Sequence, residues 1–562
     1  MPEATLANEE SDGLRVLISK NFVHSQFESS NVERFLPRAA LSSLFTEFKV
    51  KEELSSPSDD LIKFICTDAP KIFAIVLVTL PDISNLELTS VMKSFQSHTF
   101  KDEYLPIDNT GGLTCCFKRQ FKDSSSSEKY DRHLNSLNVF EHKLLKDHIK
   151  DFLKNQWSFL APEFPLSREL RMLDPRYILP FTETDYTTQK EGTFAKVFKA
   201  KLRADHSGVP QVYIIIRGIG NVSDSNVNLQ ANGAHEVDVA IKKFKLRDNI
   251  DLDPSEISDP KSSWSHEADN MEEIGKIGSG NPCIARVIGS FSIRGNYYII
   301  MSWASGGNLR EFWRSREPTL SGDLIMQFLV QYRNLAGALT SLHQLGGSGD
   351  GLSVISLPVP VSVPQNQENS LNDEDDDFTK QDGSNWRHGD LKPENLLRQQ
   401  EGEALGTLMV GDVGLAKKHL NPTSVRQSTD TRLGTLDYEP PEAFINSNAK
   451  SRTYDIWSMG CIVFETVIWL LYGPTGQSRF YAEPYNNRTG TRYYEDGFLG
   501  KVVNRNVAKW MDHILAKDPE CSGESPTVLK DLLILTRDKL LVVNPPNSYA
   551  DPVVEKEFQC RK

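Results

Sequence analysis

The sequence predicts an α+β protein, because helix-like runs, strand-like runs and an ordinary globular composition occur together. Apolar residues recur at helical spacing near the front of the chain, in residues 59–66 and 140–157. Runs of β-branched residues follow at 239–241 and 299–300. The chain has 562 residues, of which 39% are hydrophobic and 25% are charged, so it can build more than one domain with a sizeable core.

Charge and cysteine content limit the partners and the compartment. A net charge of −13 argues against nucleic acid or an anionic membrane as the main partner, and we expect neither. The longest apolar stretches, 73–80 and 461–472, are too short to span a bilayer, and Glu465 interrupts the second. Seven cysteines without a paired CxxC frame and a polar start without a signal-like apolar core predict an intracellular protein, cytoplasmic or nuclear.

A polar string in the second half of the chain carries the functional signal. Residues 388–395 read His-Gly-Asp-Leu-Lys-Pro-Glu-Asn, and an Asp-Val-Gly sequence follows at 412–414. Asp390 is a candidate base that orients a hydroxyl and accepts its proton, and Lys392 adds a compact positive charge. Asn395 and Asp412 supply hard oxygen ligands of the kind that Mg²⁺ prefers. This set predicts phosphoryl transfer from a nucleotide.

Two residues upstream complete the pattern. Lys242 ends the β-rich run, and Glu267 lies in a helical stretch, so an ion pair between them would aim the ammonium group at the α- and β-phosphates. Taken in this order with the 388–395 string, these residues resemble those of the eukaryotic protein kinase superfamily. The 387–397 and 468–473 strings also resemble kinase-like proteins of filamentous fungi.

The resemblance implies a two-lobed kinase fold over residues 178–560. The β-rich small lobe is expected at 178–302 and the mainly helical large lobe at 303–560. A mainly helical N-terminal region, 13–177, and a disordered tail, 1–12, precede them. Two insertions are expected near 204–235 and 345–384, and the second is acidic and predicted to be disordered.

The resemblance also assigns an ATP site. The glycine-rich loop keeps one glycine of the usual three, with Lys190 and Ala195 in place of the others. Gly192 would allow the backbone to approach the phosphates, and Phe194 and Val197 would cover the phosphates and the adenine, with Lys242 at the α- and β-phosphates. Ala240 and Leu397 would complete the adenine sandwich, Met301 would be the gatekeeper, and Ser302 and Ala304 would lie in the hinge. Asn395 and Asp412 would be the Mg²⁺ ligands.

The stretch 434–442 resembles the end of a kinase activation segment, in which Thr435 would brace the catalytic loop near Asp390. Together with Lys392, this threonine resembles the serine/threonine branch, so protein substrates with Ser or Thr acceptors and Mg-ATP are implied. Asp455 would tie down the catalytic-loop backbone. Gly389 stands where phosphate-regulated kinases carry arginine, so ordering through that residue is not expected.

Two other functions stay open at this point. A pseudokinase scaffold is favoured by the reduced glycine loop and by Val413, which replaces the usual phenylalanine, but the retained polar residues oppose it. A small-molecule phosphotransferase is the second, since His-Gly-Asp also resembles aminoglycoside and choline phosphotransferases, which usually continue with histidine rather than Lys392. The sequence makes no prediction of oligomeric state.

Overall fold

The computed structural model describes part of the chain, in two compact units. The first unit is Met1–Ala268 with Val287–Trp303, and the second is Asp269–Arg286 with Ala304–Lys562. The described residues are 12–28, 33–109, 113–115, 140, 143–166, 171–191, 195–207, 236–245, 260–277, 281–343, 385–400, 405–412, 417–419, 436–441, 443, 453–483, 491–498 and 500–543. The predicted tail up to residue 11, residues 208–235 and 345–384 of the insertions, and Gly192, Phe194, Val413 and Thr435 lie outside them.

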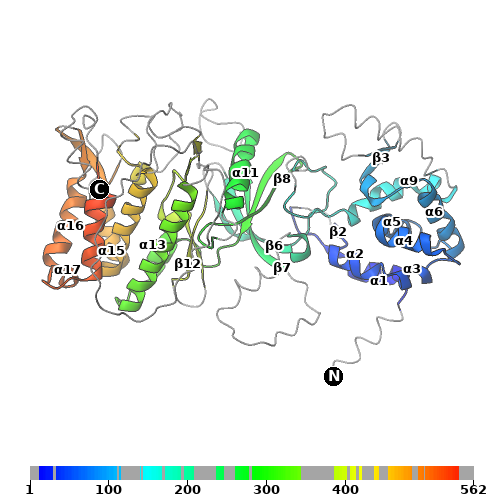
Figure 1. Ribbon diagram of the computed structural model, residues 1–562, viewed down its shortest axis with the longest axis horizontal. Coiled ribbons are helices and arrows are strands. Elements are labelled where there is room, and N and C mark those ends of the chain that lie inside the picture. Colours follow the sequence, from blue (N-terminus) through cyan, green and yellow to red (C-terminus); the bar gives the residue numbers. More distant parts are fainter. Residues whose placement is uncertain are drawn as a thin grey trace, which may run out of the picture. The chain divides into compact units, whose positions relative to one another are not determined.

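The front of the first unit is mainly helical, as its helix-like runs predicted (Figure 1). Two small antiparallel hairpins, β1 with β2 and β3 with β4, accompany its helices. These elements are α1 Leu14–Asn21, β1 Val23–His24, β2 Arg34–Phe35, α2 Arg38–Leu44, α3 Glu47–Glu52, α4 Asp59–Thr67, α5 Pro70–Thr79, α6 Asn85–Ser97, η1 Asp102–Tyr104, β3 Ile107–Asn109, β4 Leu113–Cys115, α9 Lys143–Asn155 and η2 Gln156–Phe159.

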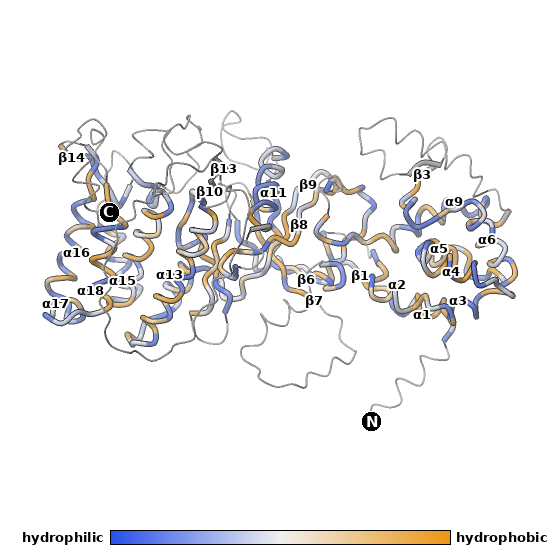
Figure 2. The backbone as a smooth tube through the Cα atoms, in the orientation of Figure 1, coloured by the Kyte–Doolittle hydropathy of each residue, from blue (hydrophilic) through white to orange (hydrophobic). Residues whose placement is uncertain are grey.

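Local chemistry explains where these helices start and which one is central. Ser58 caps α4 by accepting from the backbone N–H of Leu61, and Ser84 with Glu87 forms a capping box on α6. Helix α5 is apolar nearly all round, as Figure 2 shows, and its residues 72–77 are almost completely buried. A helix of this kind must lie inside a core, and α5 contacts α1, α4, α9 and η2.

The rest of the first unit is a five-stranded antiparallel sheet, in the order β5-β6-β7-β9-β8, with helix α11. Strands β8 and β9 join through a tight turn at Arg294 and Gly295, both with positive φ, which matches the right-handed twist of the strands. The elements are β5 Phe181–Glu191, β6 Ala195–Arg203, η4 Ala204–His206, β7 Glu236–Phe244, β8 Val287–Ile293, β9 Asn296–Ser302 and α11 Pro260–Ile277, whose residues after Ala268 group with the second unit.

The N-terminal helices and this sheet share one hydrophobic core. Side chains alternate across a strand, so Val239 and Ile241 lie on one face of β7 and Ala240 and Lys242 on the other. The face of Val239 and Ile241 belongs to the same buried cluster as the helical part, and we call it the core face. The opposite face, here called the Lys242 face, is the one on which the sequence predicts nucleotide binding. The domain boundary near residue 177 stays a prediction, but packing does not divide the chain there.

Residues that precede the sheet in the sequence also form backbone hydrogen bonds with both of its edge strands. At the β5 edge, the Gln26 N–H donates to the carbonyl of Phe181 at 2.9 Å. At the β8 edge, Ser292 donates to the Arg171 carbonyl at 2.7 Å and accepts from Leu173 at 2.8 Å, with a parallel bridge at Met172. These bonds occupy backbone groups that an exposed sheet edge would otherwise present to solvent.

The second unit is mainly helical with short hairpins, as the resemblance implied for the large lobe. Its hairpins pair β10 with β13, β11 with β12 and β14 with β15. The elements are α12 Leu309–Ser315, α13 Gly322–His343, β10 Asn385–Arg387, η7 Pro393–Asn395, β11 Leu396–Gln399, β12 Thr407–Val410, β13 Lys417–His419, η10 Leu436–Tyr438, α15 Thr453–Ala482, β14 Tyr494–Gly497, β15 Gly500–Val503, α16 Arg505–Lys517, α17 Pro519–Ser522, α18 Val528–Leu535 and η11 Thr536–Leu540.

Helix α15 forms the core of this unit. It is the one helix in the described part of the chain that is long and apolar enough to cross a membrane, and 83% of its apolar 18-residue stretch is buried within the protein. The core helix of a globular protein has the same length and composition. The element is interrupted at Gly473, where φ is 63° and Pro474 follows, so its first segment ends at Tyr472.

Candidate active site

The first unit supplies an ion pair between Lys242 and Glu267. The Lys242 Nζ lies 2.7 Å from Glu267 Oε1, and the two side chains are only 12% and 7% exposed. Strand β7 supplies the lysine and helix α11 supplies the glutamate. A partly buried pair of this kind requires good geometry, because both charges lose hydration. The structure thus forms the pair that the sequence predicted.

Three of the predicted nucleotide residues share the Lys242 face of the sheet. In the strand register, Val197 lies opposite Lys242, and Ala240 lies opposite Met301. Ala240 is two positions from Lys242 on β7, so the alternation of side chains places all four on one face. The predicted hinge also falls at a structural boundary, since the first unit ends at Trp303 and the second resumes at Ala304, immediately after Ser302.

The second unit supplies a compact cluster around the Asp390 carboxylate. The Lys392 Nζ donates to Asp390 Oδ2 at 2.8 Å. The Asn395 Nδ2 donates to the same oxygen at 3.0 Å and to the Asp390 carbonyl at 2.8 Å. The short η7 turn at Pro393–Asn395 brings the asparagine back toward the aspartate. Asp390 is therefore held in one orientation, as a base that must meet a hydroxyl in line requires.

Backbone bonds bring Asp412 to the same cluster. Strands β11 and β12 pair, and the Gly411 N–H donates to the Asn395 carbonyl at 2.8 Å. Leu397 packs so closely on Gly411 that a Cβ there would lie 2.7 Å from the leucine side chain. Asp412 itself has a φ of 50°, a left-handed conformation uncommon for residues other than glycine. Such a conformation is found at sites where a side chain must be aimed.

The chemistry of these donors fits a magnesium ion. Asn395 uses its amide nitrogen in both bonds to Asp390, so its amide oxygen remains to bind a cation. Asp412 is exposed and supplies carboxylate oxygens. Mg²⁺ takes a few hard oxygen ligands from protein and completes its shell with water and phosphate oxygens.

Asp455 anchors the catalytic loop, as the sequence predicted. Its carboxylate accepts from the backbone N–H groups of His388 and Gly389, both at 2.9 Å, and from His343 Nε2 at 2.9 Å. Burial opposes ionisation of Asp455, but the bond from His343 and the nearby His388 and Gly389 groups keep its pKa below the usual value. The carboxylate therefore stays charged and holds the loop.

A second buried network connects the catalytic loop to the rest of the large lobe, and sequence reasoning missed it. Arg310, at the start of α12, binds Glu394 at 2.9 Å and Glu465 at 3.0 Å, and also contacts the Tyr438 and Tyr481 hydroxyls. Glu465 accepts in addition from Tyr493 at 2.8 Å. Burial and the neighbouring Glu465 raise the pKa of Tyr438 well above its usual value, so its hydroxyl stays protonated and donates.

The signal for this network was present in the sequence. Glu465 interrupts the apolar run 461–472, and a lone carboxylate at such a position requires a buried cationic partner. Its partner lies 155 residues away in Arg310, at a distance along the chain that no local pattern identifies.

Comparison with known proteins defines the class. Residues 384–520, which contain the Asp390 cluster, Asp412 and Asp455, match the protein kinase domain. This part of the chain is therefore similar to eukaryotic protein kinases of the serine/threonine type.

The curated relatives are kinases that match over part of their length. The chain is 39% identical over 85 residues to a probable cyclin-dependent kinase 8 of Dictyostelium discoideum, covering 15% of this chain and 22% of that protein. It is 33% identical over 132 residues to Aurora/IPL1-related protein kinase 2 of Caenorhabditis briggsae, covering 24% and 38%. Against the Citron Rho-interacting kinase of Mus musculus it is 25% identical over 268 residues, covering 47% of this chain and 10% of that one. In each case the chain spans less than two-fifths of the relative.

Proposed function

We propose that the chain is an active protein kinase that transfers the γ-phosphoryl group of Mg-ATP to serine or threonine hydroxyls of protein substrates. The observation that carries this proposal is the Asp390 carboxylate, which Lys392 and Asn395 hold at 2.8 and 3.0 Å. A protein that had lost catalysis would not need this arrangement of base, cation and metal ligand. We place its activity inside the cell, on the basis of the cysteine pattern alone.

Each residue has a defined task in the proposed reaction. Mg-ATP, when bound, supplies the transferable group and a metal that neutralises phosphate charge. Asp390 orients the acceptor hydroxyl and takes its proton, a contribution of about 10²- to 10⁴-fold for general bases. Lys392 stabilises negative charge near the group being transferred. Lys242, held by Glu267, binds the phosphates on the nucleotide side. Gly389 makes this a catalytic loop of the type that lacks the regulatory arginine.

The test is transfer from γ-labelled ATP with Mg²⁺ and a mixed protein substrate, comparing the wild-type chain with Asp390→Asn. We expect label on serine and threonine for the wild type and at least a hundredfold loss for the variant. Equal labelling by both proteins would show that the activity comes from a contaminant or from another site. Label on a small molecule instead of protein would favour the phosphotransferase alternative.

A pseudokinase scaffold is the second candidate, and the glycine-rich loop favours it. Lys190 and Ala195 replace two of its glycines, and both lie in paired strands, with Lys190 opposite Val197 and Ala195 opposite Phe244. A Cβ in such a loop interferes with close backbone approach to phosphate. Under this alternative the wild-type chain releases bound nucleotide unchanged.

A further inference from the structure

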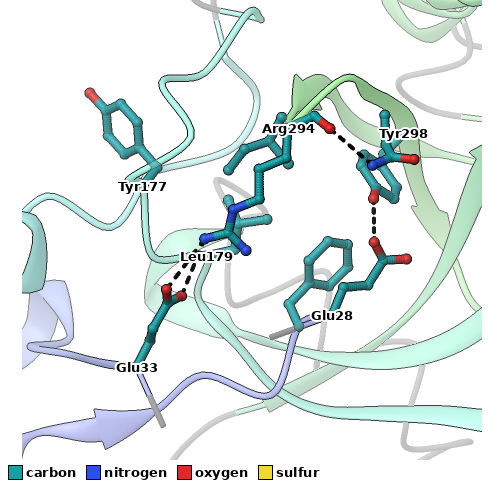
Figure 3. A pocket seen from close by; sticks show the side chains of 9 residues that line it. Glu28, Glu33, Tyr177, Leu179, Arg294 and Tyr298 are labelled. Carbon is teal, nitrogen blue, oxygen red and sulfur yellow. Dashed lines mark hydrogen bonds and ion pairs between the residues drawn. The ribbon is translucent and has the colours of Figure 1, made fainter. Parts of the chain in front are cut away.

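Glu28, in the segment between β1 and β2, binds two side chains on the core face of the sheet. Its carboxylate lies 2.8 and 3.0 Å from the Lys243 Nζ and accepts from the Tyr298 hydroxyl at 2.5 Å (Figure 3). Burial and the Glu28 charge raise the pKa of Tyr298, so this hydroxyl stays protonated and donates. A charge-assisted bond from a buried tyrosine is among the stronger polar contacts of a protein.

These two contacts fall next to the catalytic lysine. Lys243 and Tyr298 are direct partners across β7 and β9, and the adjacent pair is Lys242 with Ile299. Because successive side chains point to opposite faces, Glu28 holds the strand from the core face while Lys242 projects from the other. The same glutamate thus bonds to both strands at the position of the lysine.

Tyr298 also connects to the helix that carries Glu267. Its backbone carbonyl accepts from the indole Nε1 of Trp264 at 3.0 Å, and both residues are buried. Trp264 and Glu267 are three residues apart on α11, so they lie on adjacent turns of one face. Hydrogen bonds thus connect Glu28 through Tyr298 to Trp264 on helix α11. The same helix carries Glu267, which pairs with Lys242. Lys243, the next residue on β7, binds Glu28 and completes the network.

Two further features mark Glu28 as part of a built junction. Its φ is 47°, a conformation that costs energy for a residue with a side chain and persists only where its surroundings enforce it. It also lines a small pocket of about 120 Å³ with Phe27, Tyr177, Leu179 and Arg294. That volume is below the roughly 300–1,000 Å³ of small-molecule sites, so the pocket is too small to be a second nucleotide site.

We infer that Glu28 is a positioning residue: through Tyr298 and Lys243 it fixes helix α11 and strand β7, and so holds the Lys242–Glu267 pair in its nucleotide-binding geometry. The N-terminal region thereby sets the affinity for Mg-ATP from the far face of the sheet. This inference rests on the proposed function for its effect on nucleotide, but its effect on α11 is independent of catalysis.

The test compares Glu28→Gln with Glu33→Gln in the full-length chain. Glu33 is a matched control, because it lines the same pocket but pairs with Arg294 at the β8–β9 turn, away from Lys242 (Figure 3). We expect Glu28→Gln to raise the dissociation constant of Mg-ATP about 3- to 10-fold, in the range for residues that act through an ordered network. Amide hydrogen exchange in α11 should quicken in Glu28→Gln, while Glu33→Gln should change neither quantity.

A double-variant cycle separates positioning from a general loss of stability. Glu267→Gln removes the ion pair, so adding Glu28→Gln to it should weaken nucleotide binding no further. Additive effects of the two changes, or an unchanged α11 exchange in Glu28→Gln, would overturn the inference. If the wild type binds no Mg-ATP while α11 exchange still responds to Glu28→Gln, the proposed function fails and the positioning role stands.

Discussion

The most informative residue is Asp390, because its neighbours fix the orientation of its carboxylate. Lys392 and Asn395 both bond to the same carboxylate oxygen, Oδ2. These two bonds hold the carboxylate in one orientation. Asp412 is exposed, which suits a metal ligand that meets phosphate oxygens.

Replacing Asp390 and replacing Asp412 should therefore have different effects on transfer and on nucleotide binding. We expect Asp390→Asn to reduce transfer about 10²- to 10⁴-fold with little change in Mg-ATP affinity. Asp412→Asn should reduce transfer strongly and also weaken the Mg²⁺-dependent part of nucleotide binding. Titration of nucleotide with and without Mg²⁺ distinguishes the two, and unchanged transfer in both variants would refute the assignment.

Gly389 has a structural role in addition to replacing the usual arginine. Its φ is 77° and its N–H donates to Asp455 at 2.9 Å, so the loop turns here in a conformation that glycine adopts without strain. Any side chain at this position would have to enter the left-handed region.

Gly389→Ala should accordingly destabilise the protein by about 1–2 kcal/mol. Gly337→Ala is the matched control, because Gly337 lies in helix α13 with open space around its Cβ position, and alanine there should stabilise by up to about 1 kcal/mol. Thermal unfolding midpoints measure both changes. Equal shifts in the same direction would contradict the role given to the backbone of Gly389.

At the scale of elements, the N-terminus of α2 is capped by the small lobe. The first helical N–H groups lack partners within the helix, and here Arg38 donates to His206 Nε2 at 3.1 Å and Ala39 donates to Asp205 at 2.9 Å. His206 Nδ1 donates in turn to the Pro162 carbonyl at 3.0 Å. These bonds require a neutral imidazole, since a protonated Nε2 cannot accept from Arg38.

This contact should make stability fall in mild acid. Burial lowers the pKa of His206 from 6.5, although Asp205, the Pro162 carbonyl and Glu163 oppose that shift and Arg203 supports it. As pH falls through 6.5, His206 becomes protonated in the unfolded chain but stays neutral in the folded one. The free energy of unfolding therefore decreases until the pH drops below the pKa of His206 in the folded state.

His206→Gln keeps a donor and an acceptor but does not titrate, and it provides the comparison. Between pH 7 and 5 the unfolding midpoint of the wild type should fall more than that of His206→Gln. Parallel pH profiles for the two proteins would show that His206 does not link this junction to pH.

At the scale of the whole molecule, sequence reasoning predicted local features well. The run 59–66 corresponds to α4, and the run 140–157 contains α9 and part of η2. The Lys242–Glu267 pair and the Asp390 cluster were predicted from short motifs, and the two lobes from the resemblance that those motifs carry.

What sequence reasoning missed depends on contacts between distant parts of the chain. Glu28 meets Tyr298 across 270 residues, and Arg310 meets Glu465 across 155. Neither pair leaves a periodic pattern, because each partner sits in an unrelated local context. The common core of the N-terminal helices and the sheet was missed for the same reason.

The acidic insertion gives a further prediction at this scale. Its composition, with five acidic residues at 373–377, favours a solvated spacer between α13 and β10. Deleting residues 350–380 should leave turnover within about twofold of the wild type, by the same steady-state assay. A large drop in turnover would mean that the insertion takes part in catalysis or substrate binding.

The central claim is that the Lys242–Glu267 pair and the Asp390 cluster serve one phosphoryl transfer. Its most direct test is single-turnover transfer from enzyme-bound, γ-labelled Mg-ATP to a protein acceptor, measured for the wild type, Lys242→Ala and Asp390→Asn, since this separates binding from chemistry. We predict that the wild type transfers its label, that Asp390→Asn binds the nucleotide but retains the label on it, and that Lys242→Ala binds poorly. Wild-type protein that binds Mg-ATP and transfers no more label than Asp390→Asn would contradict the account.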